Sequence, residues 1–173
     1  GANVAHHDVP GVETHADADR PAPGAPLRLR ERGDPALEVV TYTNSFNAGQ
    51  GARRIAVFDH DGATFRLLWE HVGADRAADR VSMDAPGSIA DLDGDGSVEL
   101  VVSRLLGSSG VWSTTVHDAL TGVVRATLPD ASVLGAVVDV TGDGNPEILA
   151  TVGGAVRAYR FASDAVVQLF QID

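Results

Sequence analysis

The 173-residue chain contains no cysteine, so it can form no disulfide, thiolate metal site or cysteine nucleophile. It also contains no lysine: all 13 basic residues are arginine, against 24 acidic residues, and the formal net charge is −11. Nucleic acids and anionic membranes are bound through clustered basic residues, so this balance argues against both as partners. No stretch approaches the roughly 18 apolar residues of a membrane span, and no charged-then-apolar signal segment is present. We therefore expect no membrane insertion and interpret the chain as a mature or excised piece.

An acidic loop at residues 91–99 is the most informative feature of this sequence. Its first, third and fifth positions are aspartate, a glycine follows the third aspartate, and a glutamate stands at position nine, just before the apolar run 100–102. Carboxylates at this spacing converge on one side of a tight turn, the glycine permits positive φ, and position seven offers a backbone carbonyl. An EF-hand would place its closing glutamate at position twelve, which here is Val102. We therefore predict a calcium loop that leads into a strand. Its predicted ligands are Asp91, Asp93, Asp95, Ser97 and Glu99.

The same pattern recurs at residues 139–147, just before the apolar run 148–150. Position three is now a threonine, so this copy offers three carboxylates where the first offers four, and we predict a second, weaker calcium site. Its predicted ligands are Asp139, Thr141, Asp143, Asn145 and Glu147. A third copy at residues 30–38 has Arg30 and Arg32 where a cation needs carboxylates, so we predict no metal there. The chain is thus expected to bind two Ca²⁺ ions.

Short apolar runs separated by turn residues predict β-strands from residue 25 onward, and no stretch indicates a helix. The runs fall into three blocks of four strands, at about residues 25–85, 86–132 and 133–173, each with its loop between the first and second strands. Four-stranded antiparallel units at this spacing are typical of propeller blades, with a β-sandwich or a solenoid as the alternatives. We predict an all-β fold of three β-propeller-type blades in a partial or open propeller. Residues 1–24, rich in Pro, Ala and Gly, are interpreted as a linker or N-terminal arm.

Three blades are fewer than the four to eight that close a propeller ring. Three arrangements remain open: the chain belongs to a larger propeller, copies of it self-associate, or the end blades are covered by another segment such as residues 1–24.

The pattern Asp-x-Asp-x-Asp-Gly-x-x-Glu, followed by a Leu-Val-Val strand, resembles the FG-GAP repeats, also called VCBS-like repeats. These repeats build the propeller of integrin α-subunits and of many bacterial extracellular proteins. The resemblance covers roughly residues 25–173. It departs from the family pattern at Thr141 and at position nine, where glutamate replaces the usual aspartate. It implies one calcium ion per loop, an extracellular or cell-surface location for a secreted protein, and a role in adhesion or ligand recognition.

Two functions follow from these features. The first is a non-catalytic, calcium-binding extracellular module for adhesion, ligand recognition or scaffolding, with a protein or carbohydrate ligand. The alternative is the propeller part of a carbohydrate-active enzyme such as a polysaccharide lyase. His60, His71 and His117 are candidate general acids or bases, but no Ser-His-Asp set can be found, and we assign no catalytic residue. Only two Trp and two Tyr are available to stack on a sugar, which favours the non-catalytic function.

Overall fold

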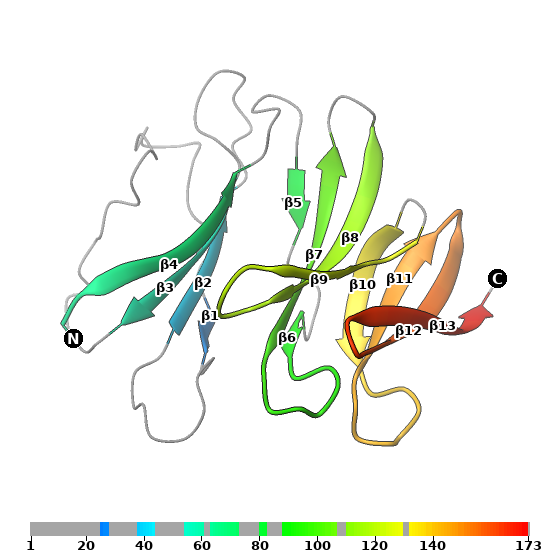
Figure 1. The fold of residues 1–173 in the computed structure, drawn as a ribbon. Helices are drawn as coiled ribbons and strands as arrows, with labels where there is room; N and C mark the ends of the chain where they lie inside the picture. Colours follow the sequence, from blue (N-terminus) through cyan, green and yellow to red (C-terminus); the bar gives the residue numbers. More distant parts are fainter. Residues whose placement is uncertain are drawn as a thin grey trace, which may run out of the picture.

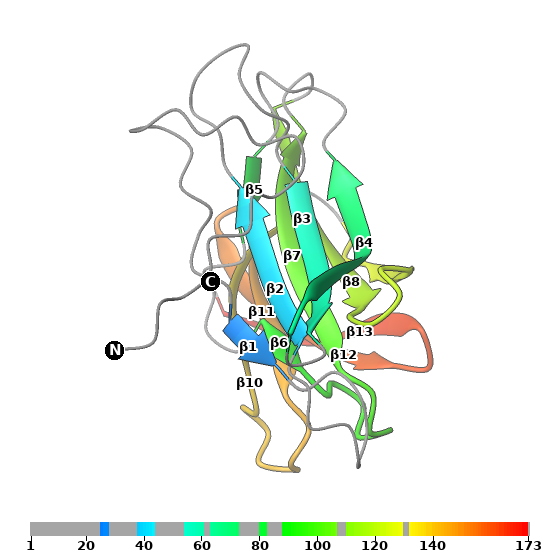
Figure 2. The ribbon, with the colours of Figure 1, turned by 90° about the vertical axis from the view of Figure 1, so that its left-hand side faces the viewer.

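The computed structural model describes residues 25–27, 38–43, 54–60, 63–72, 80–82, 88–106, 110–129 and 132–172. These residues form thirteen strands and no helix, and the strands build three antiparallel sheets that stand side by side in chain order (Figure 1). In the described part of the chain no helix is long and apolar enough to span a membrane. The predicted all-β fold with three propeller-type blades is confirmed. Figure 2 views the first blade from outside, with the other two behind it in an open row.

The first blade runs in the order β1-β2-β3-β4, with bounds Ala25–Leu27, Glu38–Thr43, Arg54–His60 and Phe65–Val72. The third blade runs in the order β10-β11-β12-β13, with bounds Ser132–Val138, Glu147–Val152, Ala155–Ala162 and Ala165–Ile172. Its last hairpin turns at Ser163 and Asp164, which both have positive φ (51° and 60°), the conformation of the two-residue turns that suit the twist of a hairpin.

The second blade departs from the four strands expected of it. It contains β5 (Arg80–Ser82), β6 (Ile89–Ala90), β7 (Glu99–Leu106), β8 (Val111–Asp118) and β9 (Val124–Thr127). Both β5 and β6 pair with β7, so its first strand consists of two pieces. Residues 80–82 form too short a run for hydrophobic periodicity to indicate a strand. Only the pairing with β7 makes it one.

All three blades share one register irregularity, which aligns them residue by residue. In each blade the pairing between the third and fourth strands shifts at the same place, just after Val57, Val116 and Ala158. The residues that pair with these three are Trp69, Ala126 and Phe170. The strand that follows each loop also begins at the loop glutamate. These glutamates, Glu38, Glu99 and Glu147, are all fully buried. Equivalent positions in different blades can therefore be compared directly.

Two apolar clusters join neighbouring blades. The cluster between the first and second blades contains Val40, Ile55, Val57, Leu100, Val102 and Ala119. The cluster between the second and third contains Leu92, Val101, Val116, Ala126, Leu128, Leu134, Val137, Ile148, Ala150, Tyr159 and Phe161. Successive residues of a strand point to opposite faces of the sheet. In β7, Leu100 and Val102 accordingly face the first blade while Val101 faces the third, so the middle blade is covered on both sides.

Candidate metal site

The first aspartate of each acidic loop organises the backbone around it. Asp91 accepts hydrogen bonds from the N–H groups of Gly94 (2.8 Å) and Gly96 (3.0 Å), and both glycines have positive φ. In the second loop Asp139 accepts from Gly142 (2.6 Å) and Gly144 (2.9 Å) in the same way. These N–H donors hold the pKa of Asp139 below its usual value. The two loops therefore fold alike, as the repeated motif predicts, and Figure 1 shows both at the same end of their blades.

The closing glutamate of the first loop is buried and bonded on both oxygens. Oε2 of Glu99 accepts from the N–H of Leu92 (2.9 Å), and Oε1 accepts from Nη1 of Arg125 (2.6 Å), which lies on β9. Burial raises the pKa of Glu99 to about 6, against the lowering effect of these two donors. A buried carboxylate is costly unless positive charge lies close to it. Glu99 therefore depends on a neighbouring cation.

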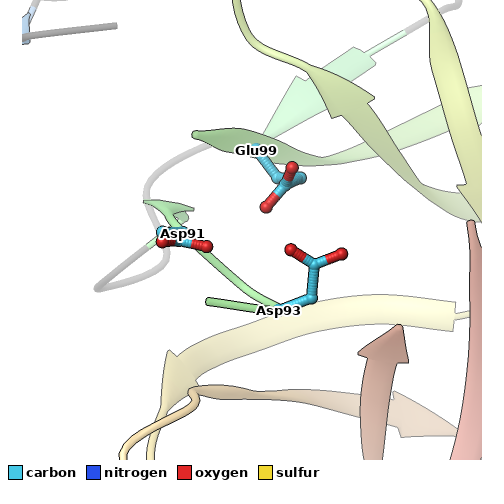
Figure 3. A group of neighbouring side chains, drawn as sticks. All are labelled: Asp91, Asp93 and Glu99. Carbon is cyan, nitrogen blue, oxygen red and sulfur yellow. The ribbon is translucent and has the colours of Figure 1, made fainter. Parts of the chain in front are cut away.

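Three of the predicted ligands converge in loop 91–99. Carboxylate oxygens of Asp91, Asp93 and Glu99 lie within 4.8 Å of one another, and Figure 3 shows the three groups turned toward a common space. Oxygens that share one calcium ion at the usual 2.3–2.6 Å lie at most about 5 Å apart, so this spacing fits the ion. Asp95 stands outside the group: it is exposed and accepts from the N–H of Ser97 (2.7 Å), which lowers its pKa.

In loop 139–147 the predicted ligands surround an arginine. Nη2 of Arg160, on β12, donates to Asp143 (2.6 Å), Glu147 (2.7 Å) and the hydroxyl of Thr141 (3.2 Å). Among the described residues of this loop, no three acidic side chains bring their oxygens within 4.8 Å of one another. The guanidinium thus occupies the position that a cation would take among these oxygens. Its hydrogen bond to Glu147 raises the pKa of Arg160 above the ordinary value.

The remaining predicted ligand, Asn145, brings the two loops into contact. Its side-chain oxygen lies 3.1 Å from the point that a Cβ would occupy at Gly94 of the first loop. Its own backbone N–H donates to Asp143 (3.0 Å). Of the eroded third loop the structure describes only Glu38, which is buried at the start of β2; Arg30 and Arg32 lie outside the described residues.

Arg125 connects the first loop to the third blade. Besides Glu99, its guanidinium lies 3.8 Å from Asp93, forms an ion pair with Asp164 in the turn between β12 and β13, and stands 5.0 Å above the ring of Phe161. The hydrogen bond with Asp164 is the main reason that the pKa of Arg125 is raised. No motif in the sequence marks Arg125 or Arg160 as part of a site. The available signal was indirect: a glutamate at a strand start needs a cation, and in a chain without lysine that cation is an arginine or a metal.

Two of the candidate catalytic histidines, His71 and His117, lie next to each other within the fold, with ring centroids 6.3 Å apart. His117 is 1% exposed, and its two ring nitrogens contact the hydroxyl of Thr115 (2.8 Å) and the carbonyl of Gly122 (3.2 Å). His71 is half-buried and bonds to Arg104 across the contact between the first two blades. His117 is thus committed to the fold and cannot reach a substrate.

Comparison with known proteins shows similarity in structure and not in sequence. No protein-family model matches the chain, and no curated protein sequence matches it. The fold is similar to that of a PL11 rhamnogalacturonan lyase from Bacillus licheniformis, with a TM-score of 0.62 and 17% identity over 90% of this chain and 34% of that one. It is also similar to the exotype rhamnogalacturonan lyase YesX (TM-score 0.61, 16% identity, 88% and 33% of the chains) and to the rhamnogalacturonan lyase YesW (0.61, 16%, 94% and 37%). This chain spans about a third of the length of each.

Proposed function

We propose that this chain is a calcium-binding segment of a propeller that acts on acidic polysaccharide of the rhamnogalacturonan class. One observation carries the proposal: the likeness extends over 88% to 94% of the chain in each of three solved rhamnogalacturonan lyases. The polysaccharide-lyase alternative predicted from the sequence is thereby favoured over an adhesion module. The adhesion function rests on the resemblance of the loops to FG-GAP repeats alone.

Within this function, Asp91, Asp93 and Glu99 would hold the calcium ion, which would supply positive charge to an acidic loop whose closing glutamate is buried. The charge balance favours this loop over the second. Each loop has one arginine hydrogen-bonded to its closing glutamate, but loop 91–99 offers four carboxylates, whereas loop 139–147 offers three, and Arg160 contacts two of those, Asp143 and Glu147. Calcium affinity follows the number of charged ligands. We therefore assign the stronger site to loop 91–99 and expect Arg160 to compete with calcium in the second loop.

We assign this segment a structural and binding role, and no bond cleavage of its own. A lyase reaction needs a base within hydrogen-bonding reach of the proton that it removes. His117, the most deeply buried of the candidate bases, is enclosed between two blades. An extracellular, secreted location fits this role, since polysaccharides of this class are met outside the cell.

Electrophoresis through gels that contain rhamnogalacturonan tests the proposal. Because the chain and the polysaccharide are both acidic, retardation is expected with millimolar calcium and is expected to disappear with chelator. A gel with neutral dextran serves as the control polysaccharide, and Asp93→Asn as the control variant that weakens the ion site. Equal mobility in all gels, or release of unsaturated sugar by the chain alone, would contradict the proposed role.

A further inference from the structure

A pocket lies between the second and third blades. Its walls come from the turn between β8 and β9, from the start of β9 and from the turn between β12 and β13. The lining residues are Asp118, Thr121, Val123, Val124, Arg125 and Asp164. The cavity volume is about 480 Å³, within the roughly 300 to 1,000 Å³ of small-molecule sites. Because an apolar cluster already joins these two blades, the pocket is formed within the chain.

The two aspartates of the pocket are each bonded through one carboxylate oxygen. Oδ1 of Asp118 accepts from the N–H groups of Leu120 (3.1 Å) and Thr121 (2.7 Å) and from the Thr121 hydroxyl (2.7 Å). Oδ1 of Asp164 accepts from Nε of Arg125. Among the described residues, no hydrogen bond reaches Oδ2 of either aspartate. The pocket thus offers two charged acceptors to a ligand.

Arg125 adds a donor to these two acceptors. Its Nε and Nη1 are bonded to Asp164 and Glu99, whereas Nη2 lies 3.8 Å from Asp93, beyond the length of a hydrogen bond. These partners and the ring of Phe161 hold the guanidinium in place before a ligand arrives. A sugar hydroxyl can donate to a carboxylate and accept from a guanidinium. Such bonds to charged partners are stronger than bonds between neutral groups.

Another part of the pocket is apolar. Val123 and Val124 line it beside the charged groups, and these side chains are 61% and 47% exposed. A ligand that fits has one polar edge and one apolar edge. Sugars have this form, because hydroxyl groups and C–H groups lie on different sides of the ring, and a 6-deoxy sugar adds a methyl group. Burying that methyl group on the valines favours binding.

The charge of the pocket selects against an acidic sugar. Two aspartates and one arginine line it, which leaves one net negative charge. The carboxylate of a uronic acid would be repelled by this charge. A neutral sugar makes the same hydrogen bonds without the repulsion.

We propose that this pocket binds the neutral 6-deoxyhexose unit of the polysaccharide. Adjacent hydroxyl groups of that unit bond to Asp118, Asp164 and Arg125. Its methyl group packs on Val123 and Val124. The inference rests on the proposed function, since rhamnogalacturonan contains both a neutral deoxyhexose, rhamnose, and an acidic sugar, galacturonate. The pocket therefore distinguishes the two sugars of the polysaccharide.

Titration of the isotope-labelled whole chain with single sugars, followed by NMR of the backbone amides, tests the proposal. Chelator is present throughout, so that no calcium ion binds the sugar hydroxyls. L-Rhamnose is expected to shift the signals of residues 121–125 and of Asp164. L-Mannose has a hydroxymethyl group in place of the methyl group and should bind about fourfold more weakly, because the apolar contact of that methyl group is lost. D-Galacturonate should leave these signals in place.

Two variants and two matched controls locate the site. Asp164→Asn should weaken L-rhamnose binding by about tenfold or more, since a hydrogen bond to a charged group is lost. Asparagine tolerates the positive φ of this residue. Val124→Ser should weaken binding by about fourfold. Asp59→Asn, which removes the same charge from an ion pair on the first blade, and Val111→Ser, at the opposite end of β8 from the pocket, should leave the affinity unchanged.

The outcomes separate this inference from the proposed function. Retention of the chain in rhamnogalacturonan gels, with no shift of residues 121–125 by L-rhamnose, would overturn the pocket and leave the proposed function standing. Shifts of these residues without retention in the gels would support the pocket as a sugar site and refute the proposed function. Absence of both would refute both. Equal affinity for L-rhamnose and L-mannose, or shifts of these residues by D-galacturonate, would also overturn the inference.

Discussion

Replacing Trp69 by alanine is expected to weaken the contact between the first two blades. The free energy of unfolding should fall by about 3 kcal/mol. Truncating a buried tryptophan to alanine usually costs about 3 to 5 kcal/mol. Because Trp69 is half-buried, we expect a cost at the lower end of this range. About 1 kcal/mol of this is the hydrogen bond from Nε1–H to the carbonyl of Ala119. Urea unfolding followed by circular dichroism measures the change.

Gly122 offers the sharper test of the same contact, because the indole leaves no room for a methyl group there. A Cβ at this residue would lie 2.5 Å from the ring, and its φ of +75° disfavours a side chain in any case. The backbone conformation alone should cost about 1 kcal/mol. In the wild-type background Gly122→Ala should cost about 2 to 4 kcal/mol, since overpacking adds about 1 to 3 kcal/mol to the backbone cost. In the Trp69→Ala background only the backbone term should remain.

The control is Gly110→Ala, at a φ of +65° with no atom within 4 Å of the new Cβ. It should cost about 1 kcal/mol in both backgrounds. Residues in contact are expected to show such coupling in a double-mutant cycle. If Gly122→Ala costs the same with and without Trp69, the described contact between the two blades is wrong.

Two further outcomes are expected. Arg125→Gln should lower the free energy of unfolding by about 3 kcal/mol in the presence of chelator, because it leaves Glu99 buried without its ion pair. The control is Arg66→Gln, which removes an exposed ion pair and should cost under about 1 kcal/mol in the same urea titration. Burial is the main cause that lowers the pKa values of His71 and His117, so the folded chain takes up their protons at lower pH than the unfolded chain, and stability should fall as pH drops below about 6.5. The stability difference between wild type and His117→Phe should therefore shrink between about pH 7.5 and pH 5.5, and a constant difference would refute this assignment.

The blades were predictable because their strands and turns are encoded locally. Alternating apolar residues on either side of short polar turns indicate the hairpins from neighbouring residues, and the loop motif fixes its own backbone through Asp91 and Asp139. The short strand β5 escaped prediction because it exists only through its pairing with β7. Its three residues carry no period of their own.

The ion pairs within the two acidic loops were less predictable, since the arginines that form them come from distant strands. Arg160 reaches Glu147 from β12, and Arg125 reaches Glu99 from β9, and neither contact leaves a fixed spacing in the sequence. Counting carboxylates predicts that loop 91–99 is the stronger site. Both closing glutamates bond a guanidinium, but Arg160 also hydrogen-bonds Asp143, an aspartate of its own loop. The contact between Trp69 and Gly122 has the same long-range character, because it joins two different blades.

Calcium binding by loop 91–99 is most directly tested by the melting temperature of the chain with calcium, with magnesium and with chelator. At millimolar calcium a site with a dissociation constant of about 10⁻⁴ M adds about 1.4 kcal/mol. For a domain of this size this corresponds to a rise of about 3 to 6 °C over the chelated chain. The rise should disappear in Asp93→Asn, and calorimetric titration of Arg160→Gln should show a second equivalent of calcium. A melting temperature that is the same with calcium and with chelator, or that magnesium raises equally, would contradict calcium binding by loop 91–99.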